Sequence, residues 1–433
     1  MASVSRATSV SKRTNASKRS SVSREANASR RPTISQGKPA SPTPGWAVFL
    51  WLGVFLPFFA GSALGEDIRG SMPFIRSQAM GGSYIALADE SSALFHNPAA
   101  LPWLKTWNVE LLTLQMTANE LTKDLFFNPQ KVASQFQQIT AANISSLVNQ
   151  TVFADVQLVV PMLVFPKQGV FSLLGAEFLS NLEILDTKPL PSLRVEVFAD
   201  KMFIAGGGGK LGDHFSYGYD LRTINRTGVD KTYSFLELFV AGVTIDPTLL
   251  PEVNQAFNQG ISYTNAGWDL GAMVSYPELP GSPRAAITSQ NITLNSQGHL
   301  HGIEFGPRAT ADTPPRAGEL PQLNTLGLAF TSRYDVYRLT LGVDYVDFTN
   351  TVLPHKEWIP RTRVGVEAAI WEHTDGTPLM SVMGGFNGYY TSWGVMTRVW
   401  FFEMGYSQYT VEVGSHKGDW PDQRRSVIIG FRF

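Results

Sequence analysis

The charged side chains that could do chemistry stand singly in alternating polar and apolar segments and form no catalytic motif. The sequence has no Gly-x-Ser-x-Gly motif, no phosphate-binding loop, no zinc-type spacing and no cysteine, which excludes disulfides and thiolate metal sites. On inward faces, single charges would either line a permeation path or pair across the interior to hold neighbouring strands, and both interpretations stay open. The candidates are Asp155, Asp269, Asp344, Arg363 and Glu367.

Two of these candidates, Arg363 and Glu367, lie four residues apart on one face of the same segment. That spacing is too long for an ideal contact, so we expect their partners on adjacent strands. His299 and His301 alternate in an expected loop and could face a metal, although such histidines are more typical of solvated side chains. We therefore expect a protein that is not an enzyme and that holds no cofactor or metal.

The segments that carry these charges alternate with a period of two residues, which is typical of β-strands. In residues 338–348, Leu339 and Leu341 share one face, while Thr340 and Asp344 share the other. The same alternation occurs in three further segments, at residues 154–164, 268–275 and 363–370. One face of each segment is therefore apolar, and the other carries charges and small residues.

Alternation alone would also suit a soluble β-sandwich. Strand lengths of about 9 to 13 residues favour a membrane barrel, because a tilted strand of that length crosses a bilayer. Short turns also alternate with longer connections, as in outer-membrane barrels. We therefore predict an all-β fold, with residues 107–433 forming a transmembrane antiparallel up-and-down β-barrel of about 14 strands. An even count would bring both ends of the barrel to the periplasmic side.

The N-terminal region has a different composition. Residues 1–45 are rich in Ser, Arg and Lys, which predicts a disordered basic extension. Residues 46–65 are apolar and uncharged, and Ala63-Leu64-Gly65 resembles a small-x-small processing site. A stretch of about 20 residues could instead be a membrane helix, but Pro57 and the small residues at its end favour a cleaved signal peptide. The formal net charge of -1 gives no reason to expect nucleic acid as a partner.

The chain ends with RRSVIIGFRF, in which Val427, Ile429, Phe431 and Phe433 share one face. This ending resembles the C-terminal signal by which bacterial outer-membrane barrels are recognised for assembly. Phe431 and Phe433 are therefore the expected assembly signal. Together with the export signal, this ending predicts location in the bacterial outer membrane, with outer-membrane lipid and the barrel assembly machinery as partners.

Three short elements follow the signal: Met80-Gly81-Gly82, Ala88-Asp89 and Asn97-Pro98-Ala99. In this order they resemble the N-terminal segment of the FadL-type and PorV-type (TraF-like) bacterial outer-membrane β-barrel family. LTLGVDYVDF, RVGVEAAI and MGGFNGYYTSWG resemble the PorV and TraF-like branch, so the likeness covers most of residues 76–433. In the FadL branch this segment is a hatch inside the barrel. The resemblance therefore implies a hatch, or plug, over residues 66–106.

The residue types in this segment suit a compact insert. Gly81-Gly82 would let the backbone turn and approach the wall closely, and Asp89 would cap the short turn that follows it. Pro98 would hold Asn97 extended, so that the Asn97 side chain satisfies backbone groups that water cannot reach. Ala99 is small enough for a crowded lumen. From the residues alone, a turn with no gating role remains the alternative.

Amphipathic helical patterns interrupt the strands at residues 119–147 and 247–257. The strand order places both in extracellular loops. Resemblance to FadL-type transporters implies that such loops capture a hydrophobic ligand, and packing against the barrel rim is the alternative.

Two functional classes follow from the resemblance. The FadL branch implies passive, hatch-gated admission of hydrophobic small molecules, fatty-acid-like or aromatic. The PorV branch implies a structural or scaffold partner for secreted or envelope proteins. Because likeness of fold alone underdetermines function, both classes stay open.

Overall fold

The computed structural model describes residues 74–104, 108–127, 151–165, 169–185, 192–234, 262–293, 322–350, 358–372, 378–413 and 420–433. By its internal contacts the chain divides into Met1–Gly53 and Val54–Phe433, and every described residue belongs to the second unit. The basic extension, the expected signal peptide with its cleavage site, His299, His301 and the helical pattern at 247–257 lie outside the described residues. Among the helices that are described, none has the length and apolar character of a membrane span.

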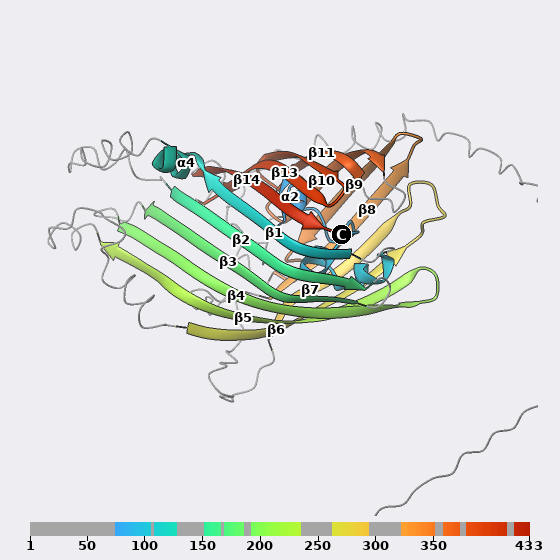
Figure 1. Cartoon of the computed structure of the whole chain (residues 1–433), viewed down its shortest axis with the longest axis horizontal. Coiled ribbons are helices and arrows are strands. Elements are labelled where there is room, and N and C mark those ends of the chain that lie inside the picture. Colours follow the sequence, from blue (N-terminus) through green and yellow to red (C-terminus); the bar gives the residue numbers. More distant parts are fainter. Residues whose placement is uncertain are drawn as a thin grey trace, which may run out of the picture. The chain divides into compact units, whose positions relative to one another are not determined.

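The described part of the chain is dominated by strands, shown in Figure 1. One helix beside them, α4 (Glu120–Phe127), directly follows the first strand, at the start of the predicted helical pattern. The strands are β1 (Asn108–Asn119), β2 (Thr151–Phe165), β3 (Gly169–Leu185), β4 (Ser192–Leu211), β5 (Phe215–Ser234), β6 (Ser262–Ser275), β7 (Arg284–Thr293), β8 (Leu323–Arg333), β9 (Tyr337–Val346), β10 (Thr362–Glu372), β11 (Pro378–Phe386), β12 (Thr391–Val399), β13 (Phe402–Glu412) and β14 (Pro421–Arg432). The prediction of an all-β, antiparallel, up-and-down fold is confirmed.

Each strand pairs antiparallel with its neighbours in sequence, and β1 also pairs with β14. This last pairing closes the sheet into a barrel. Closure leaves none of the paired strands with a free edge, which is the condition for placing a sheet in lipid.

Strands β3, β4 and β5 are longer than the sequence predicted, with 17, 20 and 20 residues. In β5 the alternation of apolar and polar residues fades into a polar stretch around Asp230 and Lys231, so the sequence pattern does not indicate the end of this strand. Pairing of β4 with β5 nevertheless continues to their ends, where Ser192 faces Ser234. The extra length is thus held by the β4–β5 ladder.

The two faces of the barrel have the opposite polarity to those of a soluble β-protein. On β8, Thr325, Gly327 and Ala329 are buried, whereas Leu326, Leu328 and Phe330 are 41%, 50% and 47% exposed. A soluble sandwich would bury the apolar set. Apolar residues outside and small or polar residues inside are the pattern of a barrel that lipid surrounds.

Residues 74–104, called the plug from here on, pack against the inner face of the barrel (Figure 1). The plug contains α2 (Ile75–Ala79), α3 (Ala93–His96) and the 3-10 helix η2 (Pro98–Trp103), joined by tight turns. Its apolar side chains form one core with inward side chains of the wall, among them Met202, Met273 and Met396. Where the plug lies, the barrel interior is therefore filled by protein.

Glycines on the inner faces of the strands let the plug approach the wall closely. A Cβ atom added at any of these positions would lie 2.2 to 3.1 Å from a plug atom, closer than packed atoms tolerate. They belong to β4, β5, β6 and every strand from β8 to β12, so the wall meets the plug from most directions. These inner-face glycines are Gly206, Gly218, Gly271, Gly327, Gly342, Gly365, Gly385 and Gly394.

Candidate functional site

Arg76 on α2 joins the plug to the wall through a two-pronged ion pair. Its Nε and Nη2 donate to the two carboxylate oxygens of Glu367 on β10, at 2.9 and 2.5 Å. Its Nη1 donates to Asp89 at 2.5 Å and to the Tyr84 hydroxyl at 3.2 Å, both within the plug. The Arg76 and Glu367 side chains are 3% and 0% exposed. Separating such a pair would leave a buried charge without its partner.

Arg338 on β9 reaches the same carboxylates from the wall. Its guanidinium nitrogens lie 3.7 Å from Asp89, 3.5 Å from Glu367 and 3.1 Å from Glu372 on β10. Burial would raise the pKa of Asp89, but Arg76 and Arg338 outweigh it and lower that pKa to about 2. Asp89 is therefore ionised at neutral pH and is held by one arginine of the plug and one of the wall.

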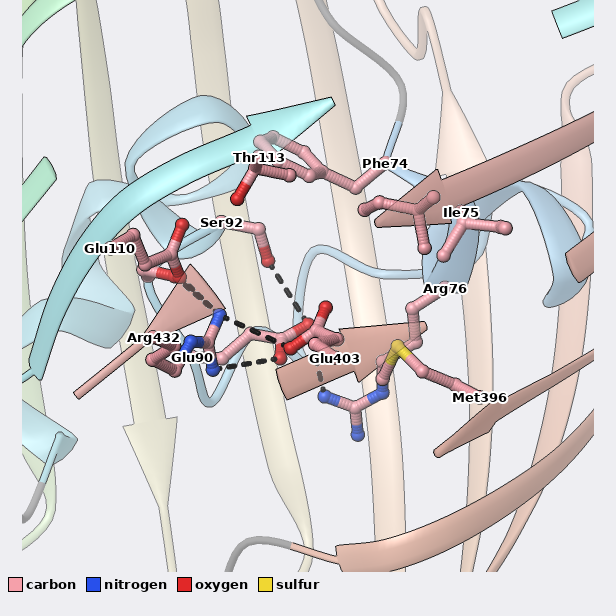
Figure 2. A pocket seen from close by; sticks show the side chains of 12 residues that line it. Phe74, Ile75, Arg76, Glu90, Ser92, Glu110, Thr113, Met396, Glu403 and Arg432 are labelled. Atoms are coloured by element: carbon pink, nitrogen blue, oxygen red, sulfur yellow. Dashed lines mark hydrogen bonds and ion pairs between the residues drawn. The ribbon is translucent and has the colours of Figure 1, made fainter. Parts of the chain in front are cut away.

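A second ionic cluster lies at a small pocket between the plug and β1, β12, β13 and β14, shown in Figure 2. Glu90 of the plug accepts a hydrogen bond from Arg398 on β12, whose Nε donates to Glu403 on β13 at 2.5 Å. Nitrogens of Arg432 lie 3.8 Å from both Glu90 and Glu403. The plug thus contributes the Glu90 carboxylate to a cluster in which Arg398 and Arg432 come from the wall, and Arg76 of the plug lies 3.5 Å from the same carboxylate.

This second cluster also spans the pairing of the first and last strands. Arg432 on β14 pairs with Glu110 on β1 and donates to Ser91 of the plug at 3.0 Å. Ser91 donates in turn to Glu110. The plug is therefore bonded to both strands where the barrel closes.

Asp344 on β9 fixes the middle of the plug by a different contact. One of its oxygens accepts the backbone amides of Tyr84 and Ile85, at 2.6 and 2.9 Å. Beside it, Arg363 on β10 packs its side chain against Gly82 and donates to the Asn387 carbonyl at 3.1 Å. Together with Glu367, these two predicted lumen residues therefore touch the plug.

The remaining predicted lumen residues bind the wall. Asp155 on β2 accepts the amide of Gln157 at 2.7 Å. Asp269 on β6 pairs with Arg222 on β5 and accepts the Asn291 backbone amide at 2.7 Å. Both carboxylates are buried. The structure therefore groups the five candidates by what they contact, with three at the plug and two within the strands.

Within the plug, the glycine pair adopts the expected turn. Gly81 and Gly82 have φ angles of 66° and 83°, in the region that favours glycine. A Cβ at Gly81 would lie 2.5 Å from the Phe386 backbone nitrogen, so this turn presses against β11.

The Asn97-Pro98-Ala99 element also has the expected local bonding. The fully buried Asn97 side chain donates to the Ile85 carbonyl at 2.9 Å and accepts the Ala99 amide at 3.0 Å. Asn97 thus caps η2, with Pro98 as its first residue. A gating role for this element stays a prediction.

Asp89 does not cap the turn that follows it, as the sequence suggested it would. The residue that precedes α3 is Ser92, and no side chain caps that helix. The Asp89 carboxylate pairs with Arg76 instead, because a full opposite charge attracts it more strongly than amide dipoles do.

Sequence reasoning missed Arg76, Glu90, Arg398 and Arg432. Arg76 and Glu367 are 291 residues apart, so no local pattern links them. The available signal was compositional: a segment of small and apolar residues keeps one arginine and two adjacent acids, Asp89 and Glu90.

His96 is the last residue of α3. Its ring packs against those of Phe74 and Tyr84, with centroid distances of 6.2 and 4.8 Å. Its Nε2 is buried and has no hydrogen-bond partner. Burial lowers the pKa of His96 to about 4, so the imidazole is neutral at neutral pH.

Phe431 and Phe433 lie at the end of the chain, where Phe401 stacks on both rings at centroid distances of 6.4 and 5.6 Å. Phe433 is 65% exposed. This placement agrees with an outward aromatic ending, and recognition by the assembly machinery stays a prediction.

Neither a protein-family model nor a curated protein sequence matches the chain. Among solved structures, the chain is similar to the toluene transporter TodX of Pseudomonas putida, with 10% identity, a TM-score of 0.45, and 85% of this chain and 99% of that chain covered. For the toluene transporter TbuX of Ralstonia pickettii the values are 11%, 0.43, 84% and 98%. For a FadL homologue of Pseudomonas aeruginosa they are 11%, 0.28, 87% and 98%.

Proposed function

We propose that the protein is an outer-membrane barrel that admits hydrophobic small molecules passively, with the plug as its hatch. The observation that carries the proposal is a closed barrel, apolar outside, whose interior holds a separate segment bonded to the wall by side chains. A barrel that served only as an anchor would not need an insert held by separable ion pairs.

The hydrophobic class of ligand follows from the surfaces that meet when the hatch is closed. Leu94 and Phe95 of the plug belong to the same core as Ile204 on β4 and Ile224 on β5. Movement of the plug would expose an apolar surface on the wall. Contact with such a surface lowers the free energy of an apolar solute but not that of an ion. The methionines in this core suit a contact that must repack, because their side chains are flexible and unbranched.

The hatch would move without leaving the protein, because its C-terminal end at Leu104 runs into β1 through only three residues. The contacts that must separate are the Arg76 and Glu90 clusters and the Asp344 cradle. When these contacts break, water molecules replace the lost hydrogen-bond partners, so opening breaks no covalent bond.

An engineered disulfide tests the hatch directly. The Ser83 Oγ lies 2.7 Å from where a Cβ at Gly342 would be, which is within the reach of a disulfide. The chain has no cysteine of its own, so Ser83→Cys with Gly342→Cys introduces a unique pair. In intact cells, whose lipopolysaccharide slows the unassisted entry of apolar solutes, we expect oxidation to slow uptake of a neutral hydrophobic probe, and a reductant to restore it.

The two single-cysteine variants are the matched controls. Neither should respond to the oxidant, and Gly342→Cys alone shows whether a Cβ 2.6 Å from the Leu87 side chain already loosens the plug. Equal uptake by the oxidised and reduced double variant would exclude the plug as a hatch. If the wild-type barrel admits no hydrophobic probe and instead copurifies with a secreted or envelope protein, the scaffold role replaces transport.

A further inference from the structure

Strands β4 and β5 are about twice as long as a membrane crossing requires. Each has 20 residues, whereas a tilted strand crosses a bilayer with about 9 to 11. The two strands lie side by side and pair over their whole length (Figure 1). Their short connection, residues 212–214, lies at the end of the barrel that an even strand count places on the periplasmic side. The other half of the β4–β5 ladder would therefore extend past the bilayer on the outer side.

The outward face of this ladder changes polarity about halfway along. From Leu211 to Phe203, the outward residues of β4 are apolar or glycine, and the next outward residue is Lys201. On β5, the exposed Tyr219 belongs to the apolar half, whereas Asn225 is exposed and faces Lys201 across the ladder. At the tilt of a membrane strand, the roughly ten residues from Leu211 to Lys201 rise by about 25 Å, the height of the apolar band of such barrels.

Lys201 lies on the lipid-facing surface of the wall. Its neighbours Asp200 and Met202 point inward and are 3% and 2% exposed, whereas Lys201 is exposed. Within the part of the chain that the structure describes, no carboxylate pairs with the Lys201 ammonium. By contrast, Arg425 on the outer face of β14 pairs with Glu120. The outer face of β4 thus carries a cation without a described acid beside it.

The height of Lys201 matters for its cost. A lysine on the lipid face destabilises a barrel at the middle of the bilayer and has little effect near the interfaces. Its methylene groups can pack along the apolar wall while the ammonium reaches the headgroup layer. At a membrane surface, an anionic headgroup stabilises such a cation.

The apolar surface below Lys201 indicates what carries this anion. Phe203 and Leu221 lie on the outward faces of β4 and β5, below the level of Lys201, and Phe203 is 38% exposed. Acyl chains that pack against these side chains belong to lipids whose headgroups lie at the level of Lys201. A lipid therefore brings its phosphate to this lysine from the side that the barrel already presents to the membrane.

We propose that Lys201 binds the phosphate of an outer-leaflet lipid and so fixes the height of the β4–β5 ladder in the membrane. The inference rests on the outer-membrane placement in the proposed function, and it does not depend on passage of a solute through the barrel. Below the phosphate, β4 and β5 face acyl chains. Above it, the rest of the ladder stands among the headgroups and beyond them.

Native mass spectrometry of the full-length barrel, released from nanodiscs, tests the site with two probes. One is lipid A, and the other is the same lipid after a phosphatase has removed its phosphates. We expect the wild-type protein to retain lipid A about fivefold better, the effect of one lysine at an anionic lipid surface. Lys201→Gln should abolish this preference, and Lys201→Arg should keep it. Lys123→Gln removes the same charge from α4, where Lys123 pairs with Glu120, and is the matched control that should keep the preference.

Equal retention of the two lipids by the wild-type protein would overturn the proposal, and so would an unchanged preference in Lys201→Gln. Displacement of lipid A by inorganic phosphate would also overturn it, because the site would then recognise a free anion rather than a lipid. Lys201→Gln should leave uptake of the hydrophobic probe unchanged. The lipid measurement and the disulfide experiment can therefore fail separately.

No part of this test depends on one variant alone. If Lys201→Gln did not fold, the comparison of the two lipids in the wild-type protein and in Lys201→Arg would still decide the proposal.

Discussion

At the scale of single residues, the plug is held by a few buried charges rather than by many weak contacts. Arg76 alone bonds to three side chains, one of them on the wall. Buried pairs of this kind add little net stability compared with an apolar contact, yet breaking one partner is expensive. Such ion pairs therefore suit a segment that is either fully bound to the wall or fully detached from it.

Arg76→Gln should release the plug, because Glu367 would keep its buried charge and lose its partner. The expected cost of seating the plug is about 3 to 5 kcal/mol. Planar-bilayer recordings should show higher conductance with unchanged abundance of the folded barrel. The double variant Arg76→Gln with Glu367→Gln should recover part of the closed state. Unchanged conductance in the single variant would exclude Arg76 as a latch.

Acid should weaken the seating of the plug through His96. The pKa of this imidazole is about 4 in the folded protein and near 6.5 when exposed, so its stabilising effect is complete above pH 6.5 and declines as the pH falls toward 4. Conductance should therefore rise between pH 7 and pH 5. His96→Phe keeps an aromatic ring beside Phe74 and Tyr84 but cannot be protonated, so it should flatten this part of the profile. A wild-type profile that is itself flat there would contradict the prediction.

At the scale of elements, the plug fits the wall because glycines, which have no side chain, stand where the two touch. Adjacent residues of β11 show it: a Cβ at Gly385 would lie 2.2 Å from the Met80 carbonyl carbon, whereas at Gly384 the nearest atom is 3.9 Å away. The two positions face opposite sides of one strand.

Gly385→Ala should therefore displace the plug without harming the wall, and Gly384→Ala is its matched control. Limited proteolysis of refolded protein in detergent should cleave the plug at least several-fold faster in Gly385→Ala than in the control. Equal protection of the plug in both variants would mean that it does not pack where the structure has it.

Much of the element order could be predicted from the sequence, because alternation along a strand reports directly which face meets lipid. The alternating segment at residues 363–370, for example, lies within β10. Glu367 and Asp344 were placed inward for the same reason. Their partners on the plug could not be predicted, because pairing between positions some 260 to 290 residues apart depends on how the barrel closes.

At the scale of the whole molecule, the outer surface predicts what surrounds it. Leu328 at the centre of β8 and Leu279 in the turn after β6 are almost equally exposed, at 50% and 49%. Only the first would lie in the hydrocarbon layer.

Leu328→Arg should destabilise the barrel in lipid by about 2 to 4 kcal/mol, and Leu279→Arg by about 0 to 1 kcal/mol. Urea unfolding in phospholipid vesicles measures both. Similar small effects at the two positions would indicate a barrel that water surrounds.

The bonding of the plug to β12, β13 and β14 has a consequence for the order of folding. The plug precedes all the strands in the chain, but its partners Arg398, Glu403 and Arg432 belong to the last three. Contacts over such sequence separations form late, because long loops must close first. The first segment of the barrel region to be synthesised is therefore among the last to reach its native place, and until then Glu90 must stay hydrated or be sheltered by a chaperone.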